Sequence, residues 1–451
     1  MDRATLRERC RASDVSRGDP GSVMASSRLR ICIGHGRVRA PGFLSMDERS
    51  DADIPYAGGA FPFEDRAVQA IIVAGLPLPM RDAGLLQLLL ECRRVLEVHG
   101  AVRLVLARSG DRRDEATQSL VTRLAVAAGL DGSTAAASPA SDARVVLEFT
   151  KRNRQVTGNP LVTIAIPAYR PTFFGIALQS ALEQTYRETE IVVGDDSEGE
   201  AIEAIVRACS APSRVRYVRN PVRLGGRGNY RQGLVLAQGE FVKFLNDDDA
   251  LAPDCVERLV EAFRSAPDIT LATSHRQRID ATGAPLPDQA ATMHIVDADT
   301  LIDGVSLGNV MLMTPLNVVG EPTTVLFRKA DLADLAPDYF RFQGEEGRGV
   351  IDMTLWATLL LRGDAVYLRD SLSRFRIHAD QQQSDAGMLR RSAAATRGLQ
   401  AAWRLLGLHK HGDPFTLRTK PYPFDAQADW IPQRVRSFQA ISMSSLTERS
   451  A

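Results

Sequence analysis

The clearest periodicity lies in residues 161–274, where short apolar runs alternate with amphipathic stretches. Short apolar runs predict buried strands, and apolar residues three and four positions apart predict helices. The expected strands are residues 161–166, 190–194, 215–219, 241–245 and 269–274, and the expected helices are residues 175–184, 201–210, 228–237 and 253–265. Strands that alternate with helices indicate an α/β domain.

A similar but weaker pattern precedes it. Strands are expected at residues 28–33, 43–47, 70–73, 102–106 and 144–149, a helix at 85–96, and a loop or hairpin at 131–143. We interpret these elements as a first α/β domain with a parallel sheet. The fold class is therefore α/β, with two Rossmann-like domains.

The remaining segments set the domain limits. Residues 151–160 are polar and contain Gly158 and Pro160, which is typical of a linker. A helix is expected at 388–405, and its moderate length and mixed charge favour docking on the second domain. The predicted organisation is a disordered arm at 1–27, a first domain at 28–150, a linker at 151–160, a second domain at 161–385, and a helical extension with a tail at 386–451.

Composition excludes several classes of protein. The 451 residues carry 55 basic and 55 acidic side chains, so the net charge is zero, which argues against a nucleic-acid partner. The five cysteines form no CxxC pair, which argues against a disulfide framework. No apolar run reaches the roughly 20 residues that span a bilayer, and the first 25 residues lack the apolar stretch of a secretory signal. We expect a cytoplasmic protein, with peripheral contact to a membrane left open.

An acidic loop, Asp247-Asp248-Asp249, directly follows the strand expected at 241–245. Adjacent carboxylates repel one another, and a divalent cation would relieve the repulsion. Mg²⁺ and Mn²⁺ prefer carboxylate oxygens and leave positions open for phosphate. The alternative is a solvated turn whose acids cap the next helix.

Three other polar clusters fall at the carboxyl ends of strands, where α/β sheets bind ligands. Pro167-Ala168-Tyr169-Arg170 follows the first strand of the second domain, and Asp195-Asp196-Ser197 follows the second. Asn229 comes after the glycine-rich stretch 225–228, at the start of a helix. Asp195 can also be read as a turn or helix-capping acid. The four clusters are expected to meet at one edge of the sheet.

Taken in order, these segments resemble the family 2 glycosyltransferases, which have the GT-A fold. The resemblance covers about residues 160–385 and rests on VTIAIPAYR (162–170), EIVVGDDSE (190–198), NPVRLGGRGNYRQG (220–233), FLNDDDALAPD (244–254) and FRIHADQQQS (375–384). It implies a sugar donor of the UDP or TDP type, an Mn²⁺ or Mg²⁺ ion, and a glycan or lipid-linked acceptor. The implied nucleotide-sugar residues are Pro167, Ala168, Tyr169, Arg170, Asp196, Arg227, Asn229 and Asp247, and the implied metal ligands are Asp247, Asp248, Asp249 and His378.

The resemblance also implies a catalytic base at the start of an amphipathic helix. Asp352 has that position, and Ile351 stands where the family usually has Glu. Asp352 would accept the proton of the attacking hydroxyl in an inverting displacement. Capping of the helix is the alternative role, and Glu345 and Glu346 are the next candidates for the base. The segment 320–324 resembles the family's acceptor-side loop, and His378 can also be read as a structural residue.

Residues 28–150 resemble class I S-adenosylmethionine (SAM)-dependent methyltransferases. The segment Ile31-Cys32-Ile33-Gly34-His35-Gly36 looks like their glycine loop, and Asp47 matches the acid that binds the ribose. The resemblance makes Gly34, Gly36 and Asp47 candidate SAM-binding residues. His35 departs from the family pattern, the loop has only two glycines, and no acid for the adenine is evident. An active, a binding-only and a purely structural domain are all left open.

Four interpretations of the whole chain compete. The leading one is an inverting, metal-dependent glycosyltransferase with a degenerate methyltransferase-like domain. A bifunctional enzyme would also methylate, and a scaffold would bind nucleotide-sugar without turnover. A nucleotidyltransferase is disfavoured, because residues 167–170 replace the Gly-rich basic loop of that class.

Overall fold

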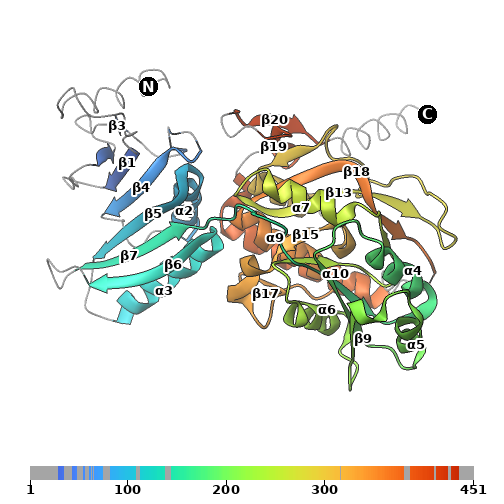
Figure 1. The fold of residues 1–451 in the computed structure, drawn as a ribbon. Coiled ribbons are helices and arrows are strands. Elements are labelled where there is room, and N and C mark those ends of the chain that lie inside the picture. The colour runs from blue at the N-terminus through green and yellow to red at the C-terminus, as the bar shows by residue number, and fades with distance from the viewer. Residues whose placement is uncertain are drawn as a thin grey trace. The chain divides into compact units, whose positions relative to one another are not determined.

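The computed structural model of the chain separates into two compact units, residues 1–153 and 154–451 (Figure 1). The division falls inside the segment expected as the linker, residues 151–160. The predicted arm at 1–27 lies outside the residues that the structure describes. Those residues are 29–34, 43–47, 54–55, 60–61, 63, 65–74, 82–107, 112–137, 144–314, 316–379, 386–410, 413–424 and 428–435.

The first unit is built on a seven-stranded mixed sheet. Its order is β3 (Ile54–Pro55), β2 (Leu44–Asp47), β1 (Leu29–Gly34), β4 (Val68–Ala74), β5 (Leu96–Ala107), β7 (Arg144–Lys151) and β6 (Leu130–Ala137). The strands from β3 to β5 run parallel, whereas β7 is antiparallel to both β5 and β6. The prediction of a purely parallel sheet was therefore wrong at this edge. The connection over residues 138–143 is too short to cross the sheet, so β6 and β7 must pair as a hairpin.

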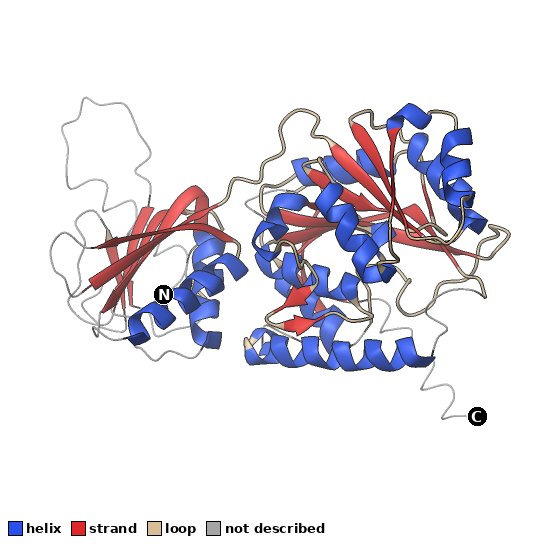
Figure 2. Cartoon of the chain, turned by 90° about the horizontal axis from the view of Figure 1, so that it is seen from below, coloured by secondary structure: helices blue, strands red, loops and turns tan. Residues whose placement is uncertain are grey.

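Two helices accompany this sheet, α2 (Asp82–Val95) and α3 (Arg112–Ala127), and they contact each other. Figure 2 shows both on the same side of the sheet. Buried and more exposed side chains alternate along β7, and the buried residues Val145, Leu147 and Phe149 share one face. The sequence did not predict α3, because its first half is largely polar. The connections β1–β2 and β2–β3, residues 35–43 and 48–53, are shorter than the dozen or so residues of a helical crossover.

The second unit is built on an eleven-stranded mixed sheet. Its order is β10 (Val215–Arg219), β9 (Thr189–Asp195), β8 (Val162–Ala168), β11 (Phe241–Phe244), β15 (Leu326–Arg328), β13 (Ile269–Ile279), β18 (Asp364–Arg376), β14 (Thr300–Ile302), β19 (Thr416–Pro421) and β20 (Ile431–Arg434), and β12 (Ala250–Leu251) pairs with β18. The four strands from β10 to β11 are parallel, so their carboxyl ends share one edge. Strand β15 is antiparallel to both of its neighbours.

Every strand and helix predicted in residues 161–274 is present, with ends shifted by a few residues. The helices of this unit are α4 (Pro171–Leu182), α5 (Ala201–Ala208), α6 (Gly225–Leu236), α7 (Cys255–Arg264), α8 (Gly304–Met313), α9 (Ile351–Arg362) and α10 (Ala386–Leu405). Short 3₁₀ turns span Pro212–Arg214, Pro322–Thr324, Lys329–Leu335 and Leu408–Lys410, and β16 (Arg341–Phe342) pairs with β17 (Glu345–Glu346). The α/β class is confirmed for both units.

Helix α9 departs from its prediction as an amphipathic helix. All its residues from Met353 to Arg362 are buried. The helix lies among α8, β13 and β16, so no side is left for solvent. Even Arg362 is buried, and its guanidinium forms an ion pair with Asp334 (2.7 Å).

Helix α10 docks on the second unit, as predicted, but its charge is not mixed, because residues 386–405 contain four arginines and no acid. Trp403 is fully buried and lies against Gly308 of α8, where a Cβ would come within 2.5 Å of the indole. Its Nε1 donates to Asn309 Oδ1 (2.7 Å). The tail was not expected to contain strands, yet β19 and β20 extend the sheet. Among the described residues, no helix combines the length and apolar character needed to cross a bilayer.

Candidate active site

The first acid of the acidic loop joins two strand ends. Asp247 Oδ2 accepts the backbone N–H groups of Tyr169 (2.6 Å) and Arg170 (2.8 Å). The loop after β11 is therefore tied to the loop after β8. Burial raises the pKa of Asp247 to about 6, although the two backbone donors oppose this shift.

The other two acids of the loop point to different partners. Asp249 is fully buried and accepts hydrogen bonds from Thr323 Oγ1 (2.6 Å), Asn246 Nδ2 (3.0 Å) and the backbone N–H of Arg376 (3.0 Å). Burial raises its pKa well above the ordinary range. The Asp248 side chain keeps 24% exposure and lies 3.1 Å from His378 Nε2. Fixed donors on the protein therefore engage two of the three carboxylates.

The expected four-ligand metal site is not assembled. Within the part of the chain that the structure describes, no group of three or more His, Cys, Asp or Glu side chains is placed to hold a metal ion. Asp248 and His378 remain as a pair of a carboxylate and an imidazole. A divalent ion such as Mn²⁺ fits that pair when phosphate oxygens complete its shell, because ions at nucleotide sites are held by one or two protein groups plus substrate phosphates.

Asp196, which was expected to contact the nucleotide base, anchors the start of α6. Its Oδ1 accepts from Asn220 Nδ2 (2.9 Å) and the backbone N–H of Leu224 (2.7 Å), and its Oδ2 accepts from the N–H of Gly225 (2.8 Å). A carboxylate has about four acceptor positions. One position on Oδ2 is therefore left over for a ligand N–H.

Two neighbouring residues have structural roles. Asn229 is buried, and its Nδ2 donates to the carbonyls of Ala168 (3.2 Å) and Gly194 (2.8 Å), which holds the ends of β8 and β9 together. Asp195 accepts from Tyr217 Oη (2.6 Å) and the N–H of Ser197 (2.9 Å), which is the turn role considered for it.

The loop after β8 presents one aromatic ring between cations. The guanidinium of Arg223 lies 4.4 Å from the centroid of Tyr169, and that of Arg170 lies 5.3 Å from it. Pro167, Tyr169 and Arg170 are only partly buried, whereas Ala168 is fully buried. Arg227 is engaged by Asp338 (2.5 Å), so it is not an unpaired cation.

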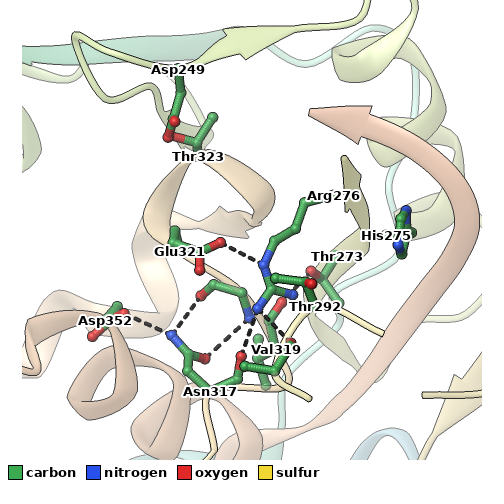
Figure 3. Close-up of polar contacts among 12 residues, drawn as sticks. Asp249, Thr273, His275, Arg276, Thr292, Asn317, Val319, Glu321, Thr323 and Asp352 are labelled. Atoms are coloured by element: carbon green, nitrogen blue, oxygen red, sulfur yellow. Dashed lines mark hydrogen bonds and ion pairs between the residues drawn. The ribbon is translucent and has the colours of Figure 1, made fainter. Parts of the chain in front are cut away.

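Asp352 lies in the first turn of α9 and accepts hydrogen bonds on both oxygens, of which Figure 3 shows the one from Asn317. Asn317 Nδ2 donates to Oδ2 (2.7 Å), and the N–H of Met353 donates to Oδ1 (2.8 Å). Burial raises the pKa of Asp352 to about 6; the Met353 N–H lowers it, and the negative charge of Glu321 raises it. By accepting the N–H of Met353, Asp352 helps to cap the first turn of α9, although the N-cap position itself is occupied by Val350.

The segment 320–324 links Asp352 to the acidic loop. The Gly320 carbonyl accepts from Trp356 Nε1 of α9 (2.9 Å), and Thr323 binds Asp249 at the other end of the segment. Between them, Glu321 forms an ion pair with Arg276 (2.6 Å), which Figure 3 shows beside Asn317. The negative charge of Glu321 raises the pKa of both Asp352 and Asp249, so it lies between the two acids.

Tyr230 marks the point where these groups converge. Its hydroxyl donates to Asn246, and its pKa is raised well above the ordinary value, first by burial. Asp352 and all three acids of the acidic loop add to that shift. A charge shifts the pKa of a neighbouring group mainly over a short distance. Tyr230 is therefore a residue near both the acidic loop and Asp352.

The candidate SAM residues are less well defined. Gly34 and Asp47 end the adjacent parallel strands β1 and β2, and the last paired residues are Ile33 and Met46. They therefore lie at one edge of the first sheet. Gly36 lies outside the described residues.

Comparison with known proteins identifies one region. The profile of the family described as "Glycosyl transferase family 2" matches residues 163–331. An uncharacterized protein of Mycobacterium tuberculosis (strain CDC 1551 / Oshkosh) is 29% identical over 55% of this chain and 76% of its own length. A GalNAc(5)-diNAcBac-PP-undecaprenol beta-1,3-glucosyltransferase of Campylobacter jejuni is 30% identical over 23% of this chain and 34% of its own. The succinoglycan biosynthesis protein ExoO of Rhizobium meliloti is 34% identical over 24% of this chain and 31% of its own.

Among solved structures, TarS 1-349 of S. aureus in complex with UDP-GlcNAc aligns with a TM-score of 0.41 and 17% identity, over 55% of this chain and 72% of that chain. The matched segment spans only about a third of the two named biosynthetic relatives. The matched residues 163–331 contain strands β8 to β11 and the acidic loop. The second unit of this chain therefore contains a region, residues 163–331, that matches the family 2 glycosyltransferases.

Proposed function

We propose that this protein transfers a sugar from a nucleotide-diphosphate donor to a hydroxyl acceptor, with inversion at the anomeric carbon and Asp352 as the base. The observation that carries the proposal is the link between Asp352 and the acidic loop through segment 317–324. Asn317 binds Asp352, a carboxylate whose pKa is raised to about 6, and Thr323 binds Asp249 of the loop that would hold the diphosphate. A protein that only bound the donor would have no use for such a carboxylate.

The donor would lie across the carboxyl ends of β8, β9 and β11. Tyr169 offers a partly exposed ring on which the nucleotide base could stack. The remaining acceptor position of Asp196 suits an N–H group of that nucleotide base. Asp248 and His378 would hold the divalent ion, which supplies positive charge to the leaving diphosphate. The nucleotide is proposed to be UDP or TDP.

Asp352 would take the proton of the acceptor hydroxyl as its oxygen attacks the anomeric carbon. The bond from that carbon to the diphosphate oxygen breaks in the same step, and the nucleotide diphosphate leaves on the opposite face. Glu321, held by Arg276, could accept hydrogen bonds from sugar hydroxyls beside Asp352. A glycan or lipid-linked acceptor is the proposed class. Release of nucleotide diphosphate from a panel of UDP- and TDP-sugars tests this function.

The pH profile provides a more specific test. A base acts only when it is deprotonated, and the pKa of Asp352 is raised to about 6 from an ordinary value of 3.8. We expect kcat/KM to rise about tenfold per pH unit below about pH 6 and to level off above about pH 7. If the acidic half of the pH profile of kcat/KM has its midpoint near pH 4, the environment described for Asp352 is contradicted. The measurement is the rate of nucleotide release between pH 4.5 and 8.5 under limiting acceptor.

Asn317 is the positioning residue for this base. We expect Asn317→Ala to lower kcat about tenfold, because Asp352 Oδ2 loses its donor and is free to rotate. Asn317→Asp places a second carboxylate about where the Asn317 amide lies, 2.7 Å from Asp352 Oδ2. The repulsion should raise the pKa of Asp352 and move the midpoint of the acidic half of the pH profile to higher pH. Donor affinity should change little in either variant. An unchanged kcat and an unchanged midpoint in both would show that Asn317 is only structural.

The first unit is proposed to have a structural or docking role. Its β1–β2 and β2–β3 connections are shorter than the dozen or so residues of a helical crossover, which leaves little room after the glycine loop for a helix that would support a bound cofactor. A bifunctional enzyme that also methylates is the second candidate, favoured by Gly34 and Asp47 at one sheet edge. Titration of the protein with SAM distinguishes the two roles.

A further inference from the structure

Helix α10 has one face packed on the second unit and one face in solvent. Figure 2 shows it as the long helix along the edge of that unit. On the packed face, Ser392 donates to the Gly349 carbonyl (2.8 Å), Gln400 donates to the Leu312 carbonyl (2.7 Å), and Trp403 is buried. These contacts fix which side of α10 faces outward.

The outward face carries a row of arginines. Arg390, Arg397 and Arg404 are exposed and lie seven residues apart, which is nearly two helical turns. They therefore project from one side, over roughly 21 Å of helix. Within the described part of the chain, none of these three side chains has an ion-pair partner.

The surrounding sequence is just as one-sided. From residue 386 to residue 412 there is no acidic residue, in a chain whose total charge is zero. Glu345 of β17 lies beside α10, where its carboxylate would approach a Cβ at Gly398 to 2.5 Å. Glu346 beside it is engaged by Arg341 (2.6 Å) and Arg348 (2.6 Å). One acid thus lies on the flank of a row of three arginines.

Apolar groups accompany the charge. Leu389 and Leu405 are 57% and 78% exposed, and each follows or precedes an arginine of the row, about 100° around the helix from it, so that the two leucines flank the row on opposite sides. Ala393, Ala394 and Ala401 are exposed on the face of the row, so little side-chain bulk separates the helix from a surface. A basic helix face accompanied by exposed apolar side chains is a feature of helices that lie in a membrane interface.

We propose that the outward face of α10 docks this protein on an anionic lipid surface. The arginine row would meet the headgroups, and Leu389 and Leu405 would lie at the two edges of the contact, near the two ends of the helix. The exposed leucines favour a bilayer over nucleic acid, which would leave them without a contact. Such docking would bring the second unit to a membrane without a spanning helix. This inference does not depend on the proposed transfer reaction.

Vesicle sedimentation of the purified full-length protein tests the proposal. We expect binding to vesicles of phosphatidylcholine with 30% phosphatidylglycerol, little binding to pure phosphatidylcholine, and a loss of binding between about 0.1 and 0.5 M NaCl. The triple variant Arg390→Gln/Arg397→Gln/Arg404→Gln should bind about a hundredfold more weakly, at roughly fivefold for each of the three charges. Leu405→Gln should weaken binding several-fold at unchanged charge.

The matched control is Arg187→Gln/Arg207→Gln/Arg369→Gln, which removes three exposed arginines from other elements. It should bind vesicles as the unchanged protein does. Equal losses in the two triple variants would overturn the proposal, as would failure of the unchanged protein to bind anionic vesicles. Tighter binding to single-stranded RNA than to vesicles, lost in the α10 variant, would assign the face to nucleic acid instead. Circular dichroism confirms that each variant is folded.

Discussion

Asp352→Asn is expected to lower kcat by a factor of about 10²–10⁴ and to leave donor affinity within about twofold. The amide keeps the size of the carboxylate and one of its two hydrogen bonds but cannot accept the proton of the acceptor. The loss should therefore appear in turnover and not in binding. The measurement pairs nucleotide release under saturating donor with calorimetric binding of the nucleotide diphosphate.

Glu345→Gln and Glu346→Gln are the controls for this prediction. Both acids come shortly before α9 in sequence and were the next candidates for the base. Glu346 is held by Arg341 and Arg348, and Glu345 is exposed on β17. Both variants should keep most of the turnover. If either of them, and not Asp352→Asn, abolishes transfer, the base is assigned wrongly.

The second large effect is expected for Asp248→Ala. Asp248 is the one acid of the acidic loop that is not held by backbone or hydroxyl donors, and it faces His378. Its removal should lower turnover about 10³-fold and abolish any stimulation by Mn²⁺, because charge stabilisation of a leaving diphosphate is worth several kcal/mol. Nucleotide release at increasing Mn²⁺ concentrations measures both effects.

Asp254→Ala is the matched control, since Asp254 is a partly exposed acid just beyond the loop, 3.8 Å from Arg258. It should retain both turnover and the response to Mn²⁺. If Asp248→Ala responds to Mn²⁺ as the unchanged protein does, Asp248 is not a metal ligand. Asp249→Ala is unsuitable as a catalytic test, because it leaves buried donors from Thr323 and Arg376 unpaired and should destabilise the fold.

The sequence predicted the parallel core of the second unit because that core is made of local patterns. Each strand from β8 to β11 is a short apolar run followed by a polar cluster, and the order of parallel strands brings those clusters to one edge. This is why the sequence alone predicted that Tyr169, Asp196 and Asp247 lie at one edge of the sheet. Their proposed roles, and the choice of Asp352 as the base, came only from the resemblance to a family.

What could not be predicted depends on contacts between distant segments. Asn317, Arg276 and Tyr230 belong to three different elements, and nothing in their local sequence marks them as neighbours of Asp352. Three adjacent aspartates predict a common ligand, but the fold turns Asp247 toward backbone N–H groups and Asp249 into the core. Carboxylates can diverge in this way because each one finds a fixed donor.

The reversed and additional strands were missed for a similar reason. A six-residue connection is compatible with a loop, so the pairing of β6 with β7 was not specified by residues 131–143 alone. The burial of α9 depends on what α8 and β13 place around it. Its sequence shows an apolar helix, and only the fold shows that no solvent face remains.

The central claim is that the edge formed by β8, β9 and β11 binds a nucleotide diphosphate. Calorimetric titration of the purified protein with UDP, with and without Mn²⁺, tests it most directly. The account predicts one site per chain, with affinity at least tenfold higher when Mn²⁺ is present. Absence of binding by UDP, TDP and GDP under any divalent ion would contradict the account.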